Sequence, residues 1–155
     1  MNYLYNMLFD MSITNFDKAI NEIPDMLITS EPLYIDGYID NNPVKILIDT
    51  GASSSIIYNN AINRLDLHSK VDTNYKSLLS GIGLEVSFGR IWYINLQISN
   101  YIFPVSLIVS NNDVSNTDII LGMNFLKACN AILDLENMTL QIKINNEKIN
   151  ISFWK

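Results

Sequence analysis

The chain has 155 residues, of which 48% are hydrophobic and 17% charged, a balance typical of one globular domain with a sizeable core. Its 16 acidic and 10 basic residues give a net charge of −6, and the few lysines and arginines are scattered along the chain. Because this pattern lacks the basic footprint of a nucleic-acid-binding protein, we expect no nucleic acid as a partner.

The apolar residues give no sign of a membrane segment. No uninterrupted apolar run approaches the roughly 18 to 20 residues that cross a bilayer, and residues 1–9 carry no basic side chain, as a signal peptide would. The single cysteine, Cys129, cannot form an intramolecular disulfide, and its small apolar neighbours predict a buried thiol. We therefore expect a soluble, cytoplasmic protein with no membrane association.

Residues 1–30 differ from the rest of the chain. Their apolar residues recur at three- and four-residue spacings, which predicts a helix over about Phe16 to Glu22. Pro24 disfavours a helical conformation in the residue before it and should end that helix. We expect a helical N-terminal lead-in over residues 1–30, followed by a second domain over residues 31–155.

From residue 33 onward the pattern changes to short β-prone runs separated by turn residues. The runs at residues 33–39 and 44–48 predict a hairpin whose second strand leads into Asp49. The runs at residues 95–98 and 101–109 predict another antiparallel pair, and two or three strands are expected between residues 131 and 153. The second domain is therefore predicted to be mostly β with short helices.

The end of the second run carries the strongest chemical signal. An apolar strand ending in Asp49, Thr50 and Gly51 delivers a carboxylate from a buried sheet into a turn. Gly51 allows a tight backbone turn, and the Thr50 hydroxyl can hydrogen-bond a neighbouring loop. Asp-Thr-Gly-Ala-Ser after a hydrophobic strand is the signature of an aspartic peptidase, although Asp-Thr-Gly alone also fits an ordinary turn. We interpret Asp49 as catalytic and Thr50, Gly51, Ala52 and Ser53 as its support.

A glycine-flanked isoleucine lies between two later strand-forming runs. Gly81, Ile82 and Gly83 predict a mobile hairpin tip. Beside a catalytic carboxylate such a tip would act as a flap, because the site must close over an extended peptide and exclude bulk water. The sole histidine, His68, lies in a polar stretch and is interpreted as a solvated loop residue. No metal site and no cofactor are expected.

A second apolar stretch is predicted to lie behind the active-site turn. Ile120 and Leu121 run into Gly122, and a short helix is expected after that glycine. A buried strand that ends in glycine allows another backbone to approach closely. We therefore expect Ile120, Leu121 and Gly122 to pack behind Asp49.

From about Leu33 to the C-terminus, these three motifs and their order resemble the retropepsin-like aspartic proteases. Within that group the chain looks most like the DNA-damage-inducible proteins, a eukaryotic family of proteasome shuttles. The similar segments are Leu33-Tyr34-Ile35, Asn42-Pro43-Val44-Lys45, Phe103-Pro104-Val105-Ser106 and Leu121-Gly122-Met123-Asn124-Phe125-Leu126-Lys127. The resemblance implies a closed β-barrel of the acid protease type. Ser53 departs from that family, which has Gln there, and looks more like a retroelement protease.

The resemblance also implies an activity. It implies an aspartic endopeptidase in which water, activated by a pair of aspartates, hydrolyses extended polypeptides. Because one chain supplies one such residue, we expect a homodimer in which Asp49 of each subunit meets on a twofold axis. The family implies ubiquitinated or proteasome-directed substrates. Two alternatives stay open: a peptide-binding or dimerisation module without turnover, and a protease derived from a retroelement polyprotein.

Overall fold

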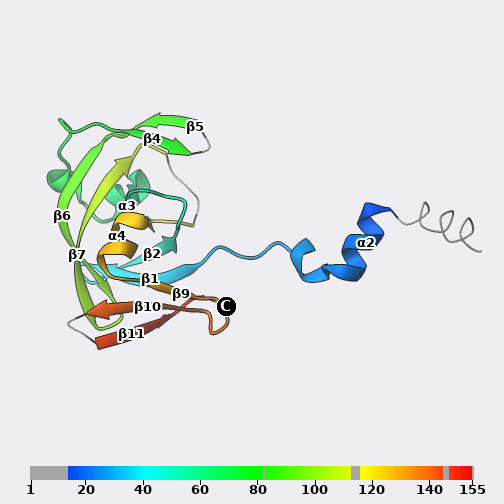
Figure 1. Ribbon diagram of the computed structural model, residues 1–155. Helices are drawn as coiled ribbons and strands as arrows, with labels where there is room; N and C mark the ends of the chain where they lie inside the picture. Colours follow the sequence, from blue (N-terminus) through cyan, green and yellow to red (C-terminus); the bar gives the residue numbers. More distant parts are fainter. Residues whose placement is uncertain (1–13, 82, 113–115, 145–146, 155) are drawn as a thin grey trace, which may run out of the picture. The chain divides into compact units, whose positions relative to one another are not determined.

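The computed structural model describes residues 14–81, 83–112, 116–144 and 147–154 (Figure 1). Contacts along the backbone divide the chain into two units, Met1–Glu31 and Pro32–Lys155. The two units are described separately below. None of the helices within the described residues has the length and the apolar character that a bilayer span requires.

The first unit contains the predicted helix. Helix α2 covers Asn15–Glu22, and a 3-10 turn, η1, covers Pro24–Leu27. Thr14 caps α2 through a capping box: its hydroxyl accepts the backbone N–H of Asp17 at 3.2 Å, and the Asp17 carboxylate accepts the backbone N–H of Thr14 at 3.0 Å. The helix ends before Pro24 because proline restricts the residue that precedes it.

The second unit begins with the predicted hairpin. Strand β1 (Tyr34–Ile39) pairs antiparallel with β2 (Asn42–Ile48). Asp40 and Asn41 connect them with φ angles of 48° and 64°, in the left-handed region that Asp and Asn tolerate best after glycine. This two-residue turn is tighter than the four turn residues suggest, so Pro43 already lies inside β2.

The remaining elements follow the predicted order. They are β3 (Ile56–Tyr58), α3 (Asn59–Arg64), η2 (His68–Lys70), β4 (Leu78–Gly81), β5 (Gly83–Val86), β6 (Gly89–Ile98), β7 (Tyr101–Ser110), β8 (Ile119–Leu121), α4 (Met123–Ala128), β9 (Ile132–Asp134), β10 (Thr139–Ile144) and β11 (Glu147–Ser152). Six strands close a barrel in the order β1-β2-β8-β3-β7-β6, while β9, β10 and β11 form a separate sheet. The predicted mostly β fold with a closed barrel and short helices is confirmed.

The core lies inside this barrel. Alternate residues of β7, namely Phe103, Val105, Leu107 and Val109, are buried as the period-two pattern predicts. Burying a side chain of this kind stabilises the fold by about 1.5–3 kcal/mol. The short strand β8 is buried along its whole length. It pairs in parallel with β2, with Ile46 opposite Ile119 and Ile48 opposite Leu121.

The C-terminal strands are attached to the start of the barrel. The backbone N–H of Trp154 donates to the carbonyl of Tyr34 at 2.9 Å. The ammonium nitrogen of Lys45 lies 4.2 Å from the centroid of the Tyr34 ring and 4.4 Å from that of the Trp154 ring. A cation that contacts two aromatic faces adds attraction between β2 and the end of the chain.

Candidate active site

Asp49 follows β2 directly and is held at the mouth of the turn. Its backbone N–H donates to the carbonyl of Leu121 at 3.1 Å, which continues the β2–β8 pairing one residue beyond the strand. Its carboxylate oxygen Oδ1 accepts the backbone N–H of Gly51 at 2.8 Å. The carbonyl of Asp49 accepts the backbone N–H of Ala52 at 3.4 Å. These contacts orient the half-buried carboxylate with backbone groups alone.

Gly51 is needed where it stands because of the carboxylate beside it. A Cβ atom at this position would lie 3.1 Å from Oδ1 of Asp49. That approach is tighter than ordinary van der Waals contact, so a larger residue would displace the carboxylate from the Gly51 N–H. The glycine therefore serves the orientation of Asp49 as well as the turn.

Gly122 allows the active-site turn to rest directly on the end of β8. A Cβ atom there would lie 2.6 Å from the carbonyl oxygen of Ala52 and 2.7 Å from that of Ser54. The next two residues complete the contact, because Met123 N–H donates to the Ala52 carbonyl at 2.8 Å and Asn124 N–H donates to the Ser53 carbonyl at 3.3 Å. Ile120 and Leu121 are buried in front of Gly122, as predicted.

One polar pair behind the turn was missed by the sequence analysis. The hydroxyl of Ser55 accepts the backbone N–H of Gly122 at 3.1 Å and donates to Oδ1 of Asn124 at 2.8 Å. Ser55 is only 1% exposed, so these bonds lie in the interior. The clue available in the sequence was the third serine of the run after Ala52, which continues a polar segment into a buried strand.

Thr50 and Ser53 are exposed at the same turn. Together with Gly51, Met123, Asn124 and Lys127 they line an open hollow of about 470 Å³. Thr50 and Met123 also line an adjoining hollow that extends to Leu126 and Leu133. The surface beside Asp49 is therefore concave and mixed in polarity.

The second strand pair of the site region forms the predicted hairpin. Strands β4 and β5 pair antiparallel, with Leu78 opposite Val86 and Gly81 opposite Gly83. Ile82, named above as the tip of the flap, lies outside the described residues. Figure 1 shows the hairpin at the end of the barrel opposite to β10 and β11.

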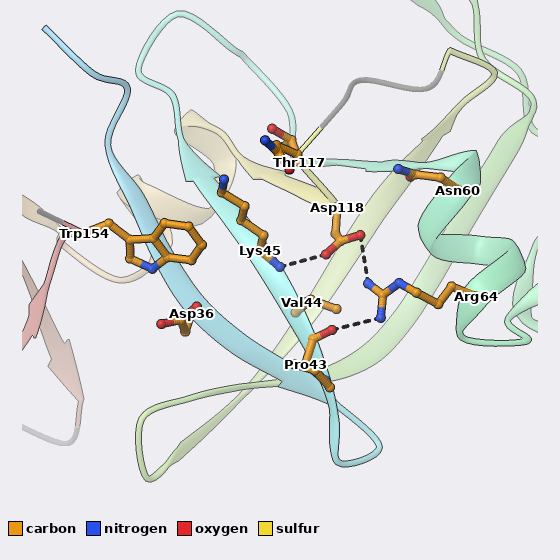
Figure 2. Close-up of a pocket in the computed structure, with 10 residues that line it drawn as sticks. Asp36, Pro43, Val44, Lys45, Asn60, Arg64, Thr117, Asp118 and Trp154 are labelled. Carbon is orange, nitrogen blue, oxygen red and sulfur yellow. Dashed lines mark hydrogen bonds and ion pairs between the residues drawn. The ribbon is translucent and has the colours of Figure 1, made fainter.

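Figure 2 shows how β2 is fixed near its start. The Asp118 carboxylate accepts the backbone N–H of Lys45 at 2.8 Å and forms an ion pair of 2.8 Å with Arg64. Arg64 also donates to the carbonyl of Pro43 at 3.0 Å. Asp118 thereby connects β2, the start of β8 and α3.

The side chains that could serve other chemistry are separated from one another. Within the described residues no three His, Cys, Asp or Glu side chains gather closely enough to hold a metal ion. His68 is exposed at η2, as predicted. Cys129 is a free, half-buried thiol whose pKa is raised by burial, so it is a weak nucleophile.

The family model for aspartyl proteases matches residues 24–134. The chain belongs to the aspartyl protease family. It is 31% identical over 134 residues to DNA damage-inducible protein 1 of Yarrowia lipolytica, covering 86% of this chain and 33% of that protein. It is also 31% identical over 125 residues to the Saccharomyces cerevisiae protein of the same name, covering 81% of this chain and 28% of that protein.

The fold has a counterpart among solved structures of the same group. The retroviral protease-like domain of Ddi1 from Leishmania major matches with a TM-score of 0.67 and 25% identity, covering 81% of this chain and 98% of that domain. The predicted resemblance to retropepsin-like proteases of the DNA-damage-inducible group is confirmed. The chain spans about a third of the length of the curated relatives that it matches.

Proposed function

We propose that the protein is an aspartic endopeptidase with Asp49 as its catalytic residue. The observation that carries the proposal is the delivery of Asp49 from a buried strand into a turn that β8 supports from behind. The bond from Gly51 N–H to the Asp49 carboxylate presets its orientation. Membership of the aspartyl protease family supports the same chemistry.

The proposed active species is a homodimer. Each chain supplies one Asp49, and the reaction needs two carboxylates that share a proton. One carboxylate takes a proton from water while the other donates a proton to the substrate carbonyl oxygen. Hydroxide from water then joins the carbonyl carbon, and the peptide nitrogen leaves as an amine after it is protonated. The exposed Thr50 would lie at the surface that a second subunit contacts.

The other site residues have proposed supporting roles. Thr50 would bond the opposite turn, while Ala52 and Ser53 would line the cleft around an extended substrate. The β4–β5 hairpin, with Gly81, Ile82 and Gly83 at its tip, would act as the flap. An extended peptide would pair with strand edges, with alternate side chains entering pockets.

The biological setting is proposed from the resemblance to the DNA-damage-inducible group. We infer ubiquitinated or proteasome-directed proteins as substrates and a cytoplasmic location. We also propose that the protease domain covers residues 31–155 and that residues 1–30 form a separate helical lead-in. The division of the described chain into units at residues 31 and 32 supports this boundary.

The decisive experiment compares cleavage of a mixed peptide library by the wild-type protein and by Asp49→Asn between about pH 4 and pH 7. Asp66→Asn is the matched control, because Asp66 is exposed and its φ of 51° suits asparagine. We expect cleavage by the wild type and the control, and none by Asp49→Asn. Sedimentation measures the subunit number of each protein.

Two other outcomes would contradict the proposal. If the wild type and Asp49→Asn both form intact dimers, bind peptides equally well and cleave none, a binding module is favoured. Sedimentation that gives only monomers at micromolar concentration would exclude the dimeric mechanism. A retroelement origin would be decided by the coding sequence that adjoins this one.

A further inference from the structure

A stacked cluster ties the segment that leads into β4 to the outside of β6. We call it the arginine stack, and it consists of Asp72, Tyr75, Arg90 and Trp92. The guanidinium carbon of Arg90 lies 4.7 Å from the centroid of the Trp92 ring and 5.2 Å from that of the Tyr75 ring. The two rings meet edge to face with centroids 5.0 Å apart. One cation is thus shared by two aromatic faces.

Directional hydrogen bonds fix this cluster. Arg90 donates through Nε to the hydroxyl of Ser106 at 2.9 Å and through Nη1 to the hydroxyl of Tyr75 at 3.3 Å. Trp92 donates through Nε1 to the carboxylate of Asp72 at 2.9 Å. The backbones of Asp72 and Arg90 also exchange two hydrogen bonds, of 2.8 Å and 3.0 Å. The arginine stack therefore links residues 72–75 to both β6 and β7.

The root of the β4–β5 hairpin lies directly beyond this cluster in the chain. The backbone N–H of Ser77 donates to the hydroxyl of Ser87 at 2.8 Å, and the backbone N–H of Ser87 donates to the Ser77 carbonyl at 2.9 Å. Ser87 is buried, whereas the first hairpin pair, Leu78 and Val86, is exposed. Both strands of the hairpin thus leave the barrel from one point, two residues after Tyr75 and three before Arg90.

The arginine stack is not required by the core. Trp92 is 53% exposed, and it stands beside the exposed Tyr93 at a bulge in β6. The barrel closes through backbone pairs and apolar side chains on the other face of that strand. A multiply bonded cluster on an exposed face, next to the root of a hairpin, points to control of the hairpin.

We propose that Arg90 is a positioning residue: by holding residues 72–77 on β6 it sets the direction in which the β4–β5 hairpin leaves the barrel. The consequence for substrates rests on the proposed peptidase function. A hairpin held in one orientation loses less conformational freedom when an extended polypeptide binds beneath it. Loosening the root should therefore weaken substrate binding more than it slows the chemical step.

The test compares Arg90→Met, which removes the charge and the donors, with Arg90→Lys, which keeps a cation. Lys148→Met is the matched control, since it removes an exposed positive charge on β11. Amide hydrogen exchange measured by mass spectrometry gives the opening of residues 72–88 without reference to activity. Fluorescence of Trp92, in a Trp154→Phe background, reports the stack itself.

We expect exchange over residues 72–88 to accelerate by about 5- to 30-fold in Arg90→Met and by less in Arg90→Lys. Exchange in β2 and β8 should stay unchanged, and the Trp92 emission should shift. For the active enzyme, KM should rise by a similar factor while kcat changes less than about twofold. The Lys148→Met protein should behave as the wild type in every assay.

Several results would overturn the proposal. Unchanged exchange and fluorescence in Arg90→Met would show that the hairpin root does not depend on the stack. Equal acceleration in β2 and β8 would reduce Arg90 to a residue of general stability. A fall in kcat with unchanged KM would exclude its role in substrate binding. Failure of the wild type to cleave any peptide would contradict the peptidase instead, because the exchange rates still decide the role of Arg90.

Discussion

The side chain and the backbone of Asp118 both hold the backbone of Lys45. The Asp118 carboxylate accepts the Lys45 N–H at 2.8 Å, and the Asp118 N–H donates to the Lys45 carbonyl at 3.0 Å. Lys45 stands four residues before Asp49, and Asp118 stands four residues before Gly122. The register of the parallel β2–β8 pair is therefore fixed at its start, and both strands then deliver their functional residues at the same level.

Replacing Asp118 with asparagine should weaken this register. Asp118→Asn removes the charge that pairs with Arg64, and the Asp118 side chain is only 17% exposed. We expect the free energy of unfolding to fall by about 1–3 kcal/mol, because a largely buried ionic acceptor is lost. Urea denaturation measures the change. Asp36→Asn, on the exposed face of β1, should change the stability by less than about 0.5 kcal/mol. Equal midpoints for both variants would disprove the role of Asp118.

The two glycines of the site should respond differently to alanine. In Gly122→Ala the new Cβ would meet two backbone carbonyls at 2.6 Å and 2.7 Å, neither of which can rotate away. We expect a loss of about 1–3 kcal/mol in stability from overpacking. In Gly51→Ala the contact is with the Asp49 carboxylate at 3.1 Å, which can rotate. That variant should lose less than about 1 kcal/mol while losing peptide cleavage at least as severely. Thermal melts and cleavage assays on both proteins separate these effects, and a more stable Gly122→Ala than Gly51→Ala would contradict the packing argument.

The parts of the fold that followed from the sequence are those governed by apolar periodicity. The hairpin into Asp49 and the buried strand into Gly122 were predicted because apolar runs and turn residues have local causes. The bond from Ser55 to Asn124 was not predicted, because it joins residues 69 positions apart through polar atoms. Asp72 was set aside within a polar loop for the same reason. Its partner, Trp92, lies 20 residues away on another strand.

Ser55 provides a direct test of that hidden bond. Ser55→Ala leaves the buried N–H of Gly122 without its acceptor and Asn124 without its donor. An unsatisfied buried donor costs about 1–3 kcal/mol, so the unfolding midpoint should fall accordingly. Cleavage should also decrease, because the turn that carries Asp49 rests on Gly122. Ser69→Ala, at an exposed position in η2, is the control and should leave both quantities unchanged. A fully active and stable Ser55→Ala would show that another group supports the turn.

The arginine stack should also respond to acid with a predictable sign. The side-chain bond from Trp92, followed by the backbone bond from Asn74, lowers the pKa of Asp72 below its usual value. Because the pKa is lower in the folded state, the stabilisation from Asp72 is present above the unfolded pKa and is lost as the pH falls through the folded pKa. Fluorescence of Trp92 in a Trp154→Phe background should therefore change with a midpoint below about 3.9, the unperturbed value for Asp. Far-UV circular dichroism on the same samples identifies any global unfolding. Asp72→Asn should show no such transition, and a midpoint above the unperturbed value would mean that Trp92 does not donate to the carboxylate in solution.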